Sequence, residues 1–220
     1  MAGSKKIGRR KQPDERKKEI IDAARDLFAS QGYDNTTMQQ VVEKAGTSIG
    51  NCYFYFSNKK ELYQGVVESV NEEISGVVDT AIREMNSPYE KLAAAVYYGA
   101  RTVLELSESA GAILTGTDHP EIRRNILNHY TRRIYRFLKR NPVITGDINL
   151  ELASAAWQGA IFNLIERQTA GQFDGDAQTV ARFLVRWNLR ALNAPDAEIN
   201  SALETVERHY REEYGSGDEV

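Results

Sequence analysis

Apolar residues recur along most of the chain at the three- and four-residue spacing that marks one face of an α-helix. No segment alternates apolar and polar residues in the way that predicts a half-buried strand. We therefore predict an all-α protein. The expected helices span about 15–31, 38–45, 48–53, 59–86, 88–108, 110–117, 120–140, 150–170, 177–192 and 197–213.

The predicted helices have recognisable starts and stops. Asp14 is a suitable N-cap after Pro13, and Gly32 supplies a left-handed stop for the first helix. Ser48 is placed to cap the third helix. The pairs that fit a capping box are Thr36–Gln39 or Thr37–Gln40, Asn58–Glu61 and Ser87–Glu90.

Two short helices joined through Gly46 and Thr47, supported by a longer preceding helix, form the arrangement of a helix-turn-helix DNA-binding unit. The apolar face from Leu62 to Met85 continues without a break, so one long helix is expected to connect this unit to the rest of the chain. The predicted organisation is a disordered basic arm at 1–12, a helix-turn-helix domain at 13–66, a larger helical domain at 67–214 and a disordered tail at 215–220.

The charge is distributed unevenly along the chain. Residues 1–66 contain 12 Lys and Arg against 8 Asp and Glu, whereas residues 67–220 contain 16 against 23, for a net charge of −3. Such asymmetry often marks a part that binds nucleic acid. The arm contributes Lys5, Lys6, Arg9 and Arg10. We expect it either to reach along the DNA backbone or into the minor groove, or to serve only as a solubilising tail.

Composition argues against several other classes of protein. No apolar run approaches the roughly 18 residues of a membrane-spanning helix, and the basic start lacks the apolar core of a signal peptide, so a cytoplasmic protein without membrane contact is expected. Cys52 is the only cysteine, which excludes an intramolecular disulfide and a thiolate metal site. His119, His129 and His209 are far apart, and no catalytic motif is present. We therefore expect no enzyme, no metal and no cofactor.

The helix-turn-helix region contains many characteristic residues at fixed offsets. They are Gly32-Tyr33, Thr36-Thr37, Ala45-Gly46, Ser48-x-Gly50, Tyr53-x-Tyr55-Phe56 and Lys59-x-Glu61-Leu62. With them, about residues 15–65 strongly resemble the DNA-binding domain of the tetracycline-repressor (TetR) family of bacterial transcriptional regulators. The resemblance implies an all-α homodimer whose variable C-terminal domain usually binds a small effector and then releases DNA.

Candidate DNA-binding residues lie on and around the third helix. Asn51 has donor and acceptor groups of the kind that read adenine edges, and Thr47 is a second candidate for base reading. Gly50 allows the helix to approach either the first helices or the DNA closely. Five residues are candidates for contact with phosphate oxygens, through a hydroxyl group or a positive charge. They are Thr37, Ser48, Tyr53, Tyr55 and Lys59. The alternative for the two tyrosines is a place in the small core of the unit.

Two positions depart from the usual pattern of the family. Thr47 stands where an apolar residue commonly precedes the serine, and Cys52 stands where a leucine or similar residue usually precedes the tyrosine. We expect Cys52 to be a small buried hydrophobic residue. Thr47 either reads a base or fills the turn.

The larger domain offers candidates for contact with an effector. They are Tyr98, Arg101, Tyr130, Trp157, Asn163 and Glu166. Aromatic residues at helical spacing also form ordinary core, so that alternative stays open for each of them. Arg101 and Glu166 lie on otherwise apolar faces and need a partner, which is either the other residue or a polar ligand.

Small and large apolar residues on two helices are candidates for a dimer interface. They are Ala156, Gly159 and Ala160 on the helix at 150–170 and Phe183 and Trp187 on the helix at 177–192. The large residues would equally suit the intrachain core. A two-fold four-helix bundle is what the family resemblance implies, and such a dimer predicts a palindromic operator in double-stranded DNA.

The predicted function is a homodimeric transcriptional regulator, more specifically a repressor that a small-molecule effector releases from its operator. The effector would favour an orientation of the long helix that changes the separation of the two DNA-binding units. The alternative is a TetR-like DNA-binding protein whose helical body docks a protein partner and binds no small effector.

Overall fold

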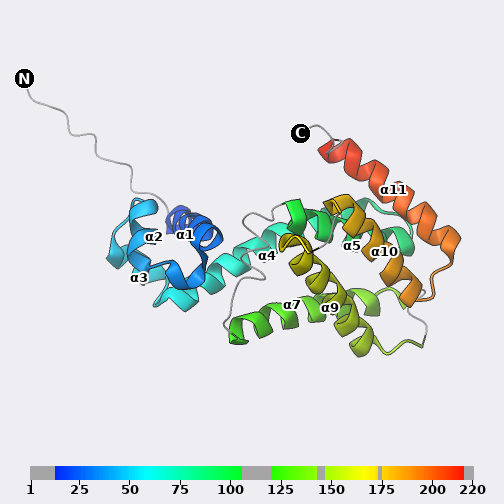
Figure 1. Ribbon diagram of the computed structural model, residues 1–220, viewed down its shortest axis with the longest axis horizontal. Coiled ribbons are helices and arrows are strands. Elements are labelled where there is room, and N and C mark those ends of the chain that lie inside the picture. Colours follow the sequence, from blue (N-terminus) through cyan, green and yellow to red (C-terminus); the bar gives the residue numbers. More distant parts are fainter. Residues whose placement is uncertain (1–12, 106–119, 143–146, 173–174, 216–220) are drawn as a thin grey trace, which may run out of the picture. The chain divides into compact units, whose positions relative to one another are not determined.

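The computed structural model describes residues 13–105, 120–142, 147–172 and 175–215, and every regular element in those ranges is a helix (Figure 1). The prediction of an all-α protein is confirmed for this part of the chain. The chain divides into two compact units, Met1–Val66 and Val67–Val220, which we call the head and the body. The expected basic arm, the helix at 110–117 and nearly all of the expected tail lie outside the described residues.

The head is built from α1 (Pro13–Asn35), α2 (Met38–Lys44), α3 (Ile49–Tyr55) and the first turns of α4 (Lys59–Glu84). Regular helical geometry in α1 breaks at Gly32, whose φ of 80° is the left-handed value expected of a helix stop. Apolar side chains from all four helices meet in one small core. Its fully or almost fully buried members are Ile20, Ala24, Phe28, Val41, Val42, Cys52, Phe56, Leu62, Tyr63 and Val66.

Of the two possible capping boxes at the start of α2, the structure contains Thr37–Gln40. Thr37 Oγ1 accepts a hydrogen bond from the Gln40 backbone at 3.2 Å, and the Gln40 side chain accepts one from the Thr37 backbone at 2.8 Å. Thr36 is instead buried and donates to the Gly32 carbonyl at 2.8 Å. Thr36 therefore fastens the end of α1, and Thr37 begins α2.

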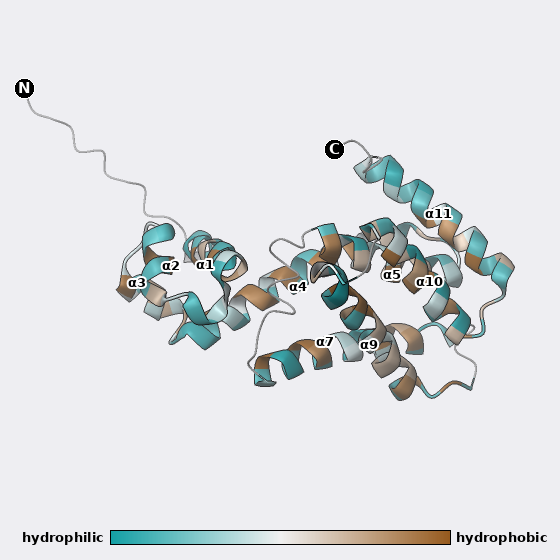
Figure 2. Ribbon diagram, viewed as in Figure 1, coloured by the Kyte–Doolittle hydropathy of each residue, from teal (hydrophilic) through white to brown (hydrophobic). Residues whose placement is uncertain are grey.

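The body contains the rest of α4 together with α5 (Pro88–Glu105), α7 (Pro120–Lys139), α9 (Leu150–Thr169), α10 (Ala177–Ala191) and α11 (Asp196–Tyr214). Helix α5 is the most buried element and packs against α10 and α11, while α7 packs against α9. Helix α11 is hydrophilic over most of its surface, with its apolar residues on the side toward the other helices (Figure 2). None of the helices in the described ranges is long and apolar enough to cross a membrane.

The long helix ends two residues earlier than predicted, at Glu84 rather than at 86. The Glu90 carboxylate accepts hydrogen bonds from the backbone N–H groups of Asn86 at 3.0 Å and Ser87 at 2.9 Å, and Ser87 Oγ accepts one from the Glu90 backbone at 3.0 Å. This predicted capping box is therefore confirmed. Because it uses the N–H groups that would continue α4, it ends that helix and starts α5.

Candidate functional site

Helix α3 of the head has one exposed face and one buried face. Ser48 Oγ accepts a hydrogen bond from the Asn51 backbone at 3.2 Å, which fixes the start of the helix. The Asn51 side chain is exposed and donates to Thr47 Oγ1 at 3.3 Å, so the two predicted base-reading residues lie side by side. On the opposite face, Cys52 and Phe56 are buried in the core of the head. The cap and the core together hold Thr47 and Asn51 at the surface.

Gly50 has open space around it within the head. A Cβ atom built at this position meets no heavy atom within 4 Å. Close packing of α3 against the other helices therefore does not require a glycine here. The other role expected for Gly50, close approach of the helix to DNA, stays a prediction.

The other predicted DNA-binding residues differ in their exposure and in their contacts within the head. Ser48 and Tyr53 are exposed, the latter at 50%, and Tyr55 is half-buried with its ring 5.0 Å from that of Phe54. Thr37 is exposed, but its hydroxyl already caps α2. The four arm residues Lys5, Lys6, Arg9 and Arg10 lie outside the described residues.

Lys59 has a structural contact that the sequence did not suggest. Its Nζ donates to the backbone carbonyls of Tyr33 at 2.9 Å and Asp34 at 3.2 Å, and it lies 4.4 Å from the centre of the Tyr33 ring. This ammonium group therefore holds the start of α4 against the end of α1. Binding of a DNA phosphate by Lys59 remains a prediction. The same ammonium group would have to contact the phosphate and these two carbonyls.

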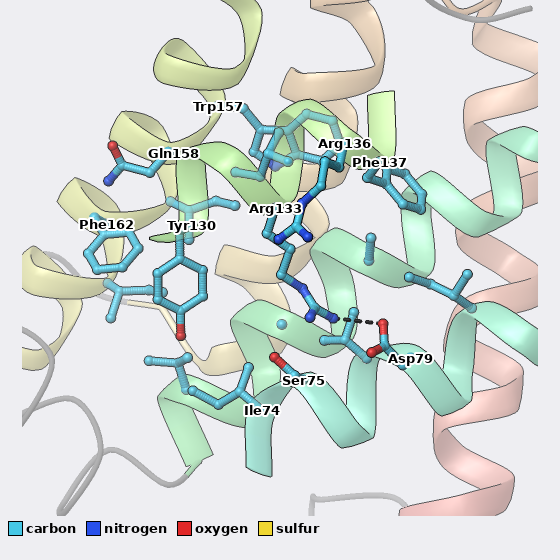
Figure 3. Close-up of a pocket in the computed structure, with 18 of the residues that line it drawn as sticks. Ile74, Ser75, Asp79, Tyr130, Arg133, Arg136, Phe137, Trp157, Gln158 and Phe162 are labelled. Atoms are coloured by element: carbon cyan, nitrogen blue, oxygen red, sulfur yellow. Dashed lines mark hydrogen bonds and ion pairs between the residues drawn. The ribbon is translucent and has the colours of Figure 1, made fainter. Parts of the chain in front are cut away.

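The body contains an apolar cavity of about 280 Å³ between α4, α5, α7 and α9. Two of the predicted effector residues, Tyr130 and Trp157, line it (Figure 3). The Tyr130 hydroxyl donates to Asn71 Oδ1 at 2.6 Å, and burial raises the pKa of this phenol. The tyrosine therefore stays protonated in the physiological pH range and adds no negative charge to the cavity.

The remaining predicted effector residues lie elsewhere. Tyr98 is buried with its hydroxyl 2.7 Å from His209 Nδ1, and neither Asn163 nor Glu166 lines this cavity. Arg101 faces a second, more polar cleft of about 520 Å³ between α5, α10 and α11. The residues predicted to contact an effector thus do not form one site, and only two of them line the apolar cavity.

Arg101 and Glu166 do not pair with each other. Arg101 Nη2 lies 2.5 Å from Glu105 one turn along α5, and its guanidinium group lies 4.6 Å from the centre of the Tyr210 ring. Glu166 lies 3.2 Å from Arg123 of α7. Each charge therefore has its own partner within the body, and neither needs a ligand for its neutralisation.

The residues predicted for a dimer interface lie on exposed faces of α9 and α10. Ala156 and Gly159 are exposed and Ala160 is half-buried. Phe183 and Trp187 are 52% and 58% exposed, and their rings stack with centres 6.1 Å apart at an interplanar angle of 16°. Leu152, on α9, is 70% exposed. These two helices therefore present large apolar side chains that the described residues of the chain leave exposed.

Comparison with protein families decides the identity of the head. Residues 20–66 match the family model described as "Bacterial regulatory proteins, tetR family". The head is therefore a DNA-binding domain of the TetR family. The matched segment includes the capped α2 and α3 and the start of α4, which contain the residues discussed above.

Curated transcriptional regulators match part of the chain. The uncharacterized HTH-type transcriptional regulator YfiR of Bacillus subtilis is 40% identical over 60 residues, which cover 27% of this chain and 29% of YfiR. The HTH-type transcriptional regulator BetI of Brucella canis is 28% identical over 124 residues, covering 54% of this chain and 62% of BetI. The match thus spans less than two thirds of each of these curated relatives.

A solved structure extends the likeness in fold to the body. The transcriptional regulator FadR of Bacillus subtilis, in complex with stearoyl-CoA, superposes with a TM-score of 0.67 at 20% identity. The superposition covers 78% of this chain and 97% of FadR. At this identity the likeness concerns the fold alone.

Two sets of candidate functional residues were not identified from the sequence. Phe54 is 80% exposed on α3, although aromatic residues at this spacing suggest core. It lies two positions from buried Cys52 and two from buried Phe56, and this spacing places it on the opposite side of the helix. Arg133, Arg136 and Arg140 line the apolar cavity, and their spacing of three and four positions already placed them on one face.

Proposed function

We propose that this TetR-family protein is a repressor that binds a palindromic DNA operator as a homodimer and releases it when a small molecule enters the body cavity. The observation that supports DNA reading most directly is the outward face of α3. It displays Thr47, Asn51 and Phe54, while the opposite face is buried in the core. A helix held in this way suits insertion into the major groove.

A palindromic operator follows from the proposed dimer. The exposed apolar residues of α9 and α10 supply a surface that a second copy would cover. A two-fold dimer has two copies of α3, which contact half-sites about one helical turn, ~34 Å, or a small multiple apart.

Ligand response is supported by the position of α4. This helix begins in the head at Lys59, and further along it contributes Ile74, Val78 and Ile82 to the cavity lining. A ligand that favours one orientation of α4 would shift the population toward head positions that do not fit adjacent half-sites. The stearoyl-CoA bound to FadR is a precedent for a ligand in a protein of this fold. The alternative, a body that docks a protein partner, is not favoured because it leaves the cavity without a role.

The first test is selection of binding sites from random DNA, followed by affinity measurements with Asn51→Ala and Tyr53→Phe variants. We expect a palindromic site. Asn51→Ala should lose about 1–3 kcal/mol of discrimination at one base position, because the amide groups that read the base are removed. Tyr53→Phe should weaken binding to operator and random DNA alike, because it removes a phosphate contact but keeps the ring. Failure to enrich any motif would contradict the proposed function.

Phe54 gives a second test that needs no change in charge. An exposed phenylalanine on a recognition helix suits the C5-methyl group of thymine. Replacing the contacted thymine by deoxyuridine in both half-sites removes only two methyl groups, each worth about 0.8 kcal/mol. We expect weaker binding of the wild-type protein and no further loss for Phe54→Ala. If every thymine of the operator tolerates this replacement, Phe54 does not read a methyl group.

A further inference from the structure

The apolar cavity has an asymmetric lining that points to a class of ligand. Most of its wall is aliphatic or aromatic, with Ile74, Val103, Phe137 and Ile161 among the lining residues. Its charged groups are Asp79 on α4 and three arginines, which come from α7 or from the residue directly after it. These arginines are Arg133, Arg136 and Arg140.

Asp79 neutralises only one of the three guanidinium groups. Arg133 Nη2 lies 2.7 Å from Asp79 Oδ1, the ion pair drawn as a dashed line in Figure 3. Arg136 Nε donates to the Arg132 carbonyl at 3.3 Å, and in the described part of the chain neither Arg136 nor Arg140 has a carboxylate partner. Three arginines against one aspartate leave the lining with a net charge of +2.

Other polar groups of the lining do not offset this charge. Tyr130 is a neutral donor that is already bound to Asn71, and Ser75 and Gln158 are uncharged. An apolar cavity with an excess of guanidinium groups suits a molecule with an apolar body and an acidic end, because arginine binds planar carboxylates through two parallel hydrogen bonds.

We propose that the cavity binds a medium-chain carboxylate, with the chain between α4, α5, α7 and α9 and the acidic group on Arg136 and Arg140. This assignment depends on the proposed function in one respect, because it treats the cavity as the site where the effector binds. The cavity volume of about 280 Å³ is large enough for an alkyl chain rather than only for a few water molecules. Decanoate, an unbranched chain that ends in a carboxylate, is a suitable probe of this class.

The lining makes two other classes of ligand less suitable. A cationic amphiphile would have to displace Arg133 from Asp79 and would then meet the charge of the other two arginines. A neutral amphiphile of the same length would fill the apolar space but would gain no charge-assisted hydrogen bonds.

The experiment measures binding of three ten-carbon probes to the full-length protein without DNA, by calorimetry and by the shift of the melting temperature. The probes are decanoate, decanol and decyltrimethylammonium, each below its micelle concentration. We expect decanoate to bind about tenfold or more tightly than decanol, because an ionic hydrogen bond is worth more than a neutral one. Equal or tighter binding of decyltrimethylammonium, or no preference for decanoate over decanol, would overturn the assignment.

Variants locate the acidic group. The double change Arg136→Gln and Arg140→Gln should weaken decanoate binding about tenfold or more and leave decanol binding unchanged, which also shows that the cavity is intact. Arg124→Gln is the matched control, because Arg124 is an exposed arginine of α7 that does not line the cavity. If Arg124→Gln weakens decanoate binding as much as the double change, the attraction is nonspecific and the proposed contact is wrong.

Operator release is then measured separately, so that the two proposals fail independently. Decanoate that binds through the two arginines but leaves operator affinity unchanged would support the ligand class and contradict the repressor mechanism. Specific operator binding with no decanoate binding would support the DNA-binding function and contradict the ligand class.

Discussion

Replacing Trp187 by glutamate is expected to convert the protein to a monomer and to lower its affinity for a palindromic operator by about 100-fold or more. Trp187 and Phe183 stack on each other and are more than half exposed in the single chain. In the proposed dimer they become buried, and a carboxylate placed there would lose its hydration without gaining a partner. Operator affinity would fall because each monomer contacts only one half-site.

Light scattering after size-exclusion chromatography measures the molecular mass, and titration of labelled operator measures the affinity. Ser201→Glu is the control, since Ser201 is an exposed residue of α11 and the change adds the same charge on a helix that carries none of the proposed interface residues. The proposed interface is incorrect if Trp187→Glu remains dimeric at the concentrations at which the wild type is dimeric.

Replacing Gly65 by alanine is expected to destabilise the head by about 1–3 kcal/mol, although alanine is the better helix former. Gly65 lies in α4, and a Cβ atom at this position would be 2.8 Å from Cε1 and 3.4 Å from Cζ of the Phe56 ring. Phe56 is only 5% exposed, so its ring has little room to move. Because Phe56 ends α3, its displacement should also weaken DNA binding.

Gly76→Ala is a matched control within the same helix. A Cβ atom there meets no heavy atom within 4 Å, so this change should stabilise the protein by up to about 1 kcal/mol through helix propensity alone. Chemical unfolding of both variants compares the two free energies of unfolding directly. Stabilisation by Gly65→Ala would show that the Phe56 ring yields easily and that a glycine is not needed at this position.

Features set by neighbouring residues could be predicted from the sequence. The capping box of Ser87 with Glu90 involves groups three residues apart, and the spacing alone identifies it. At the start of α2 the spacing limits the box to Thr36–Gln39 or Thr37–Gln40, and the structure selects the second pair. The buried position of Cys52 follows in the same way from the pattern around it. Local spacing was therefore sufficient for the element types and for the architecture of the head.

Contacts between distant segments could not be predicted. Tyr130 and Asn71 are 59 residues apart, and Arg133 and Asp79 are 54 apart, yet both pairs join α7 to α4. Their register depends on how side chains of two helices interlock, which periodicity does not determine. For that reason the charge balance of the cavity could not be predicted from the sequence.

The effector candidates show the same limit. Arg101 was expected to need Glu166 or a ligand, whereas its partner is Glu105, four residues along the same helix. That local pair was readable from the spacing. The partner of Glu166 was not, because Arg123 belongs to another helix and lies 43 residues away.

The complete burial of Cys52 has a practical consequence for testing how ligand and operator binding are coupled. The chain has no other cysteine, and this thiol is inaccessible to solvent, with a pKa that burial raises. Because thiol reagents attack the exposed thiolate, the natural protein should remain unlabelled under mild conditions. A single Ser57→Cys change at the exposed surface of the head would then take one spin label per chain. The label-to-label distance in a dimer, with and without decanoate, would report the separation of the two heads without any need to remove a native thiol.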